Sequence, residues 1–174
     1  LQPTLDTPEM RRFYYSLFKE VDQEMFKVFQ ALKESTFYED TIVVFTADHG
    51  DLLGAHGGLF QKWHNAYEES VHVPFIIHNP KLFPKKETTS MLTSHVDLIP
   101  TLLGLANIKV EDVQEKLKAD HSEVHPLVGR DLSPHVLGRK NKHRMEEAVY
   151  FMTDDEPTKG LNQVTLRGEP YESV

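Results

Sequence analysis

The sequence has no cysteine among its 174 residues, which excludes a disulfide framework and any metal site built from thiolates. It also has no apolar run near the roughly 20 residues that a membrane-spanning helix needs. Positive charge is in deficit, because 19 basic residues face 27 acidic ones and the formal net charge is −8. An acidic chain without a basic run is a poor ligand for nucleic acid. We therefore expect neither a membrane span nor a nucleic-acid partner.

The two ends of the chain carry few signals. The N-terminus begins Leu1-Gln2-Pro3-Thr4, without an initiator methionine and without the charged and apolar regions of a signal peptide. The C-terminus, residues 171–174, has no capping or stop signal. We interpret the sequence as part of a longer soluble protein, or as a segment with an engineered boundary, and its compartment stays unknown. A composition of 39% hydrophobic and 26% charged residues suits one globular domain or a large piece of one.

A long helix is predicted over residues 8–34. Thr7 offers a capping hydroxyl, Pro8 suits the first helical position, and Glu9 places an acid in the first turn. Apolar residues then recur every three or four positions, which predicts a wide apolar stripe. These residues are Met10, Tyr14, Leu17, Val21, Met25, Val28 and Leu32.

Two apolar runs, Thr41 to Thr46 and Val73 to His78, predict strands with almost no polar interruption. Such runs are typical of strands buried on both faces of a parallel sheet. A helix followed by a buried strand is half of a βαβ unit, so the predicted fold class is α/β. A further helix is expected at residues 98–105, with Asp97 as its N-cap.

The chain changes character near residue 106. Residues 1–106 contain the predicted helix, strands and Gly-rich loop 50–65, whereas residues 107–174 are polar and rich in loops. In the second part we expect helices at 109–118 and 133–137, and strands at 147–153 and 162–167. No internal repeat and no low-complexity linker separates the two parts.

The strongest candidate for chemistry is the turn Asp48-His49-Gly50 at the end of the first predicted strand. A lone Asp-His pair more often caps a strand-end turn than binds a metal. A carboxylate and an imidazole side by side at the mouth of a sheet can nevertheless supply two metal ligands. Lys62 and His64 follow on a loop, and Tyr67-Glu68-Glu69-Ser70 can form a short helix beneath the site.

This block resembles the C-terminal part of a sulfatase, in the alkaline-phosphatase-like superfamily of metal-dependent esterases. The resemblance is strongest over residues 41–105 and rests on the Asp-His-Gly turn, Lys62, His64 and the run 73–77. It implies part of an alkaline-phosphatase/sulfatase-like sandwich, with a mostly parallel central sheet flanked by helices. The sulfatase nucleophile motif, Cys-x-Pro-x-Arg or Ser-x-Pro-x-Arg, occurs nowhere in the sequence.

The resemblance also implies roles for single residues. Asp48 and His49 would be ligands of one divalent cation, with Ca²⁺ preferred, although imidazole also suits Mn²⁺ or Zn²⁺. Many sulfatases have Asn where this chain has His49. Lys62 would bind the oxygens of the ester anion, although five positions separate it from Tyr67 where many relatives have four. His64 is a weaker candidate for substrate contact, and His56 is interpreted as a loop residue near the site.

We therefore read the chain as a C-terminal-half fragment of a sulfatase-type hydrolase that is inactive alone. The expected partners are a small sulfate or phosphate ester and the missing N-terminal half, which would carry the formylglycine nucleophile. Self-association of the fragment is a further expectation. Two alternatives stay open: a phosphonate or phosphate ester hydrolase of the same superfamily, and a non-catalytic module that binds a metal or an anion.

Overall fold

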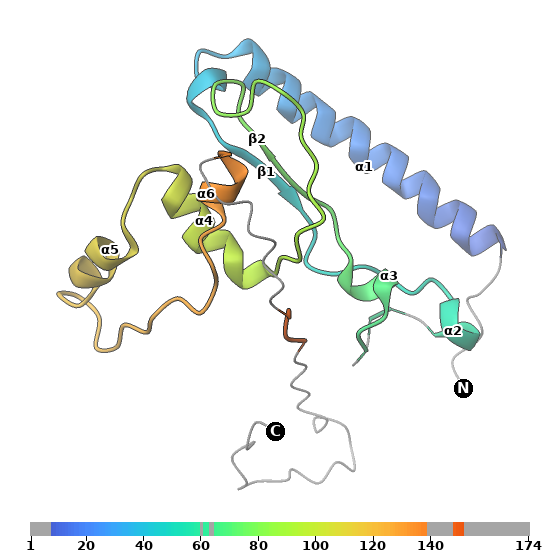
Figure 1. Cartoon of the computed structure of the whole chain (residues 1–174). Helices are drawn as coiled ribbons and strands as arrows, with labels where there is room; N and C mark the ends of the chain where they lie inside the picture. The colour runs from blue at the N-terminus through green and yellow to red at the C-terminus, as the bar shows by residue number, and fades with distance from the viewer. Residues whose placement is uncertain (1–7, 60, 63–64, 139–147, 152–174) are drawn as a thin grey trace, which may run out of the picture.

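The computed structural model describes residues 8–59, 61–62, 65–138 and 148–151 (Figure 1). In Figure 1, helix α1 runs along one side of a pair of strands, and helices α4 to α6 lie on the other side. The elements in chain order are α1 (Pro8–Glu34), η1 (Tyr38–Asp40), β1 (Val43–Thr46), α2 (Ala55–Gly58), α3 (Glu68–Val71), β2 (Phe75–His78), η2 (His95–Asp97), α4 (Leu98–Leu105), α5 (Val110–Leu117) and α6 (Ser133–Val136).

Helix α1 begins at Pro8 and ends at Glu34, as the capping pattern and the apolar period predicted. Its C-terminal half contacts the strands, because the Phe29 ring lies against the rings of Tyr38 and His78. Its N-terminal half reaches the loop after β1, where Arg11 Nε donates to the Leu53 carbonyl oxygen at 3.3 Å. No residue of α1 is fully buried, so much of its apolar stripe faces solvent.

The two predicted strands form and pair with each other, but they pair antiparallel. Val43 is opposite His78, and Phe45 is opposite Ile76. The expectation of burial on both faces is wrong for the described residues, because Phe45 is 41% and Ile76 55% exposed. The segment between the strands contains only the one-turn helices α2 and α3, and it brings β2 back beside β1 without the crossover helix typical of a parallel pair.

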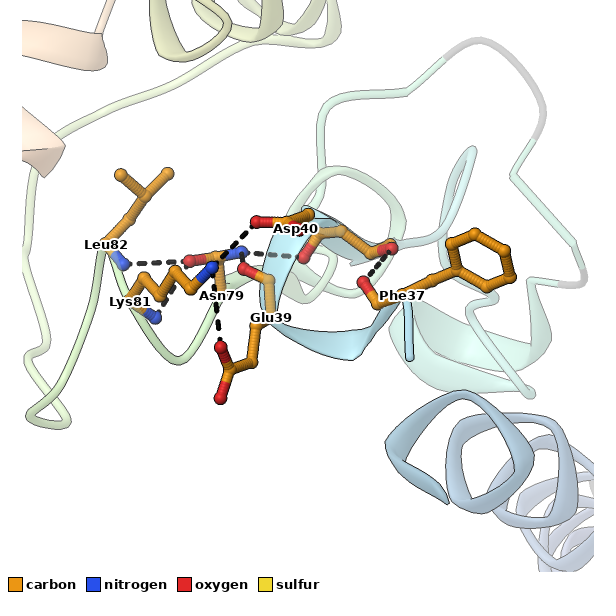
Figure 2. A network of polar contacts seen from close by, with 7 residues as sticks. Phe37, Glu39, Asp40, Asn79, Lys81 and Leu82 are labelled. Carbon is orange, nitrogen blue, oxygen red and sulfur yellow. Dashed lines mark hydrogen bonds and ion pairs between the residues drawn. The ribbon is translucent and has the colours of Figure 1, made fainter. Parts of the chain in front are cut away.

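Asn79 fixes the end of this strand pair (Figure 2). Its side-chain amide donates to the backbone oxygens of Glu39 and Thr41, both at 2.9 Å. Its side-chain oxygen accepts from the backbone N–H groups of Lys81 and Leu82. The residue is only 3% exposed, so all of these bonds are shielded from water. They tie the end of β2 to the connection that leads into β1.

A second group of contacts joins η2 and α4 to the segment before α6. Asp97 is 1% exposed and accepts from the backbone N–H groups of Ser94 and Arg130, at 3.0 and 2.8 Å. Arg130 Nη2 lies 2.7 Å from Asp97 Oδ2. Asp97 occupies the N-cap position of α4, as the sequence predicted, but its side chain makes no capping hydrogen bond to that helix. The side chain instead accepts from Ser94 in a capping box at η2.

The rest of the described chain follows the sequence in part. Helices α4, α5 and α6 lie where helices were expected. Residues 148–151 contain no strand, and the other residues of the strands predicted at 147–153 and 162–167 lie outside the described part. Within the described ranges, no helix combines the length and the apolar character needed to cross a membrane. The division of the chain at residue 106 stays a prediction.

Candidate functional site

Strand β1 delivers Asp48 and His49 to an exposed turn. The strand ends at Thr46, and two residues later Asp48 Oδ1 accepts a hydrogen bond from the His49 backbone N–H at 2.9 Å. The Asp48 side chain is 84% exposed and that of His49 is 36% exposed. The carboxylate therefore points out of the strand pair, where a ligand can reach it.

The His49 ring is held in one orientation by the backbone. Its Nδ1 lies 2.8 Å from the Gly50 carbonyl oxygen, and a carbonyl only accepts hydrogen bonds, so Nδ1 carries the proton. Its Nε2 lies 3.3 Å from Asp48 Oδ2. In the neutral ring, Nε2 and the carboxylate oxygen are both acceptors, and a proton or a cation near both relieves their repulsion. A ring that donates one N–H to a backbone carbonyl and turns its other nitrogen outward is typical of a metal-ligating histidine.

Local charges keep the Asp48 carboxylate ionised. The hydrogen bond from the His49 backbone is the largest cause that lowers the pKa of Asp48, and it outweighs the opposing effect of burial. The charge of Lys62 makes the smallest of the contributions that lower this pKa. An ionised carboxylate at an exposed turn suits a site that binds a cation.

Gly50 joins the turn to helix α3. Its backbone N–H donates to the Ser70 carbonyl oxygen at 2.9 Å. A Cβ atom at this position would lie 1.8 Å from the Glu69 carbonyl oxygen, so only glycine fits without a shift of backbone. Ser70 is 4% exposed, and its hydroxyl donates to Asn65 Oδ1 at 2.9 Å. Helix α3 thus forms the floor of the turn, as the sequence suggested for residues 67–70.

The loop that carries Lys62 is closed by backbone hydrogen bonds. Leu52 N–H donates to the Gln61 oxygen at 2.9 Å, and Gly54 N–H donates to the Leu59 oxygen at 2.8 Å. Leu52 is 3% exposed and anchors the start of the loop. Lys62 follows the second end of the loop directly and is exposed. His64 lies outside the described residues, so its role in substrate contact stays a prediction.

Two contacts near the site were not predicted from the sequence. His56 was interpreted only as a loop residue near the site, but its ring stacks on Tyr67 and its Nε2 donates to Glu69 Oε2 at 3.0 Å. His95 Nε2 donates to the Ala47 carbonyl oxygen at 2.7 Å, directly before Asp48. Each contact joins segments far apart in the chain, and no local spacing indicates it.

The described residues do not form a complete metal shell. Among them, no group of three or more His, Cys, Asp or Glu side chains is arranged to hold an ion. Asp48 and His49 offer two donors, and a full shell needs further ligands. Two other histidines, His125 and His135, bond Glu123 and Thr89 and take no part in the turn.

The chain is similar to several curated sulfatases. Arylsulfatase K of Gallus gallus is 36% identical over 101 residues, which cover 58% of this chain and 18% of that protein. Choline-sulfatase of Rhizobium meliloti is 35% identical over 104 residues, which cover 60% of this chain and 20% of that protein. Ulvan-active sulfatase of Formosa agariphila is 30% identical over 172 residues and covers 91% and 33%. The matched part of this chain therefore spans between 18% and 33% of the length of these relatives.

A solved structure and a family model agree with these relatives. A crystal structure of a candidate sulfatase from Bacteroides thetaiotaomicron matches 79% of this chain and 28% of its own, with a TM-score of 0.59 and 31% identity. This likeness supports a sulfatase-like α/β fold for the chain. The Sulfatase family model matches residues 2–108, which is more than half of the chain. The chain belongs to the sulfatase family.

Proposed function

We propose that this chain is part of a metal-dependent sulfuric ester hydrolase. Asp48 and His49 are two ligands of one divalent cation, and Lys62 binds the anionic oxygens of the ester. Membership of the sulfatase family and the names of the relatives support the reaction class. The proposal includes a mostly parallel central sheet in the whole protein, in which β1 and β2 would be one antiparallel pair.

One observation carries this proposal. Asp48 Oδ2 and His49 Nε2 lie 3.3 Å apart and face each other from adjacent residues. The Gly50 carbonyl holds the proton on the far side of the ring, on Nδ1. A ring nitrogen without a proton and a carboxylate oxygen therefore lie side by side at the end of β1. A divalent cation bound by both atoms would relieve their repulsion.

The donor set leaves the choice of metal to experiment. The carboxylate suits Ca²⁺, and the imidazole suits Mn²⁺ or Zn²⁺. We prefer Ca²⁺ on the strength of the sulfatase family. When bound, the cation would supply Lewis-acid stabilisation of the charge that develops on the ester oxygens. The further ligands and the formylglycine nucleophile would come from sequence outside this chain.

Lys62 supplies a compact positive charge on the other side of the site. An ammonium group interacts with the non-bridging oxygens of a sulfate ester as a point charge. His64 stays a secondary candidate for contact with the leaving group or the anion.

A second function is favoured by a specific residue. His49 places an imidazole where many sulfatases have Asn, and imidazole favours Mn²⁺ or Zn²⁺. Hydrolysis of a phosphonate or phosphate ester by the same fold is therefore the runner-up. The third possibility, a non-catalytic metal or anion module, would bind a cation tightly without turnover.

Variants of the turn test the proposal in the protein that contains this chain. Asp48→Ala should remove bound metal, measured by elemental analysis, and abolish hydrolysis of an aryl sulfate. His49→Asn should keep Ca²⁺ and a useful fraction of sulfate-ester turnover in a sulfatase. In a Mn²⁺ or Zn²⁺ phosphate hydrolase, the same change should release the metal and depress phosphate-ester turnover.

A matched control removes an exposed carboxylate elsewhere. Asp120→Ala changes an acid after helix α5 and should alter neither metal content nor turnover. Wild-type metal content and activity in both Asp48→Ala and His49→Asn would show that the turn is only structural. Tight metal binding by the protein without turnover of any ester would favour the binding module.

A further inference from the structure

His56 holds a backbone conformation that residues with side chains rarely adopt. Its φ is 55° and its ψ 40°, and the neighbouring Gly54 and Gly57 both have a φ of 86°. The left-handed region is disfavoured for a residue with a Cβ atom, although Asn, Asp and His occur there more often than others. Such a conformation persists only where the surroundings hold it in place, and these positions cluster at functional sites.

Two contacts hold the His56 side chain. Its ring stacks on the Tyr67 ring, with 3.6 Å between the centroids and 10° between the planes. Its Nε2 lies 3.0 Å from Glu69 Oε2, and the ionised carboxylate can only accept, so Nε2 donates. This hydrogen bond is the largest cause that lowers the pKa of Glu69. The ring is therefore fixed both in plane and in direction.

Both partners of His56 belong to the segment that supports the metal-ligand turn. Tyr67 precedes helix α3 and Glu69 lies in it. The same helix receives the Gly50 hydrogen bond through the Ser70 oxygen and approaches Gly50 at the Glu69 oxygen. The tip of the loop is thus tied to the same short helix as the turn that carries Asp48 and His49.

Lys62 lies between two sets of hydrogen bonds, one that ends at Gln61 and one that begins at Asn65. On one side, the backbone pairing of Leu52 with Gln61 closes the loop directly before Lys62. On the other side, Asn65 Oδ1 accepts from Tyr67 N–H and from the Ser70 hydroxyl at the start of α3. The bonds of His56 to Tyr67 and Glu69 join these two sides across the loop.

We propose that His56 is a positioning residue for Lys62: through Tyr67 and Glu69 it holds the loop that begins at Leu52 and closes at Gln61 against helix α3, and so sets the place of the lysine that follows the loop. This inference rests on the proposed function of Lys62 as the anion ligand. A lysine has four rotatable bonds, so a charge useful to an anion needs a fixed backbone beneath it. The side-chain contacts of His56 are to Tyr67 and Glu69, so its effect on the anion runs through the loop.

The first variant is His56→Asn. Asn tolerates the left-handed backbone, so the loop can keep its path, but its short side chain loses the stack on Tyr67 and the bond to Glu69. His56→Gln retains an amide donor at the reach of Nε2 and should restore part of the function. The matched control is His125→Asn, which removes an exposed histidine that bonds Glu123 at 3.2 Å on a remote loop.

The measurements are made on the intact protein that contains this chain, loaded with its metal. His56→Asn should weaken the binding of inorganic sulfate, measured by calorimetry, and should lower kcat/KM for an aryl sulfate by about tenfold or more. Metal content and the midpoint of thermal unfolding should stay near the wild-type values. His125→Asn should leave all four quantities unchanged.

A double-mutant cycle separates positioning from a general structural role. If His56 acts through Lys62, His56→Asn should have no further effect on sulfate binding in a Lys62→Ala background. An equal loss in both backgrounds, or wild-type sulfate binding in His56→Asn, would overturn the proposal. If His56→Asn unfolds or loses its metal, Glu69→Ala removes the acceptor of the same bond and takes its place in the cycle.

The outcome does not depend on whether the metal assignment is right. Failure of the metal-ligand proposal appears as wild-type metal content in Asp48→Ala. Failure of the present inference appears as wild-type sulfate binding in His56→Asn while Lys62→Ala binds sulfate weakly. If Lys62→Ala itself binds sulfate like wild type, the lysine is not the anion ligand and the inference about His56 is wrong with it.

Discussion

At the scale of single residues, adjacency in the sequence explains the part of the site that was predicted. Asp48 and His49 are neighbours, so a turn after a strand is enough to place both side chains at its mouth. The hydrogen bond from His49 Nδ1 to the Gly50 oxygen needs only the same three residues. The role of Gly50 as a contact with α3 depends on a segment twenty residues away, and the sequence does not indicate it.

Gly50→Ala should destabilise the protein through a direct clash. The new methyl group would meet the Glu69 oxygen at 1.8 Å, so either the turn or helix α3 must move. We expect a loss of about 2–3 kcal/mol in the free energy of unfolding, measured by denaturant titration, and weaker metal binding. Gly57→Ala is the control, because it has open space around its Cβ and only the cost of a φ of 86°, about 1 kcal/mol.

Lys62→Ala should act on the substrate anion and not on the metal. The loss of a positive charge next to the developing charge of the ester should cost on the order of 2–4 kcal/mol, or roughly a hundredfold in kcat/KM. Metal content should stay at the wild-type level, and competitive inhibition by free sulfate should weaken. Lys62→Arg should restore only part of the rate, because a planar fork does not replace a point charge.

Comparison with His64→Ala decides which residue binds the anion. The step of five residues from Lys62 to Tyr67 can turn the lysine away from the site. Near-normal kinetics in Lys62→Ala, together with a large loss in His64→Ala, would assign the anion to the histidine.

At the scale of elements, the sequence predicted where strands and helices lie but not how the strands pair. Apolar runs at 41–46 and 73–78 indicate strands, yet such runs carry no information on direction. The antiparallel register depends on the short path between them and on the bonds of Asn79. The run of apolar residues also overstated burial, because Phe45 and Ile76 pair on a face that the described residues leave open.

The pair of Asp97 and Arg130 joins η2 and α4 to the chain before α6. Burial by itself raises the pKa of Asp97, but the hydrogen bonds from Arg130 and Ser94 outweigh it and lower the pKa below its ordinary 3.8. A carboxylate whose pKa is lowered in the folded state contributes stability above the unfolded value. This contribution is lost as the pH falls from 3.8 through the lower folded value.

Asp97→Ala should therefore remove both a tether and a pH dependence. It leaves the Arg130 guanidinium, 21% exposed, without its carboxylate, and the expected cost is about 3 kcal/mol in the free energy of unfolding at neutral pH. The difference from wild type should shrink as the pH is lowered below 3.8. Glu115→Gln breaks an exposed pair with Lys118 and should change stability by less than about 0.5 kcal/mol. A constant difference between Asp97→Ala and wild type at all pH values would contradict this account.

At the scale of the whole molecule, the described chain buries little apolar surface for its size. The fully buried apolar residues among those described are Leu52, Leu105 and Leu132. Large apolar side chains on α1 stay exposed, including Phe13, Phe18 and Phe26. The apolar period predicted the stripe on α1, but an amphipathic pattern does not show which surface packs against that stripe.

The 174-residue chain by itself should not hydrolyse aryl sulfates or phosphate monoesters. It contains no Cys-x-Pro-x-Arg or Ser-x-Pro-x-Arg motif, and its described residues offer only two neighbouring metal donors. Turnover is measured with a chromogenic ester after purification to remove host enzymes. Activity that is retained through purification and is lost in Asp48→Ala would contradict this prediction.

The isolated chain should also associate with itself. A continuous apolar patch larger than a few hundred Å² is rare on a stable monomer, and α1 is 27 residues long with no buried side chain. Phe45 and Ile76 add exposed apolar surface on β1 and β2. Among the described residues each of these two strands pairs only with the other, so each also has an open edge. Sedimentation should therefore give a mass that rises with concentration, and an apolar dye should bind the chain.

Replacing both Phe18 and Phe26 by Glu should shift the mass toward the monomer, whereas Glu20→Gln with Glu24→Gln on the same helix should not. A monomer that unfolds cooperatively with high stability would show that the chain is a complete domain and that its apolar stripe needs no partner.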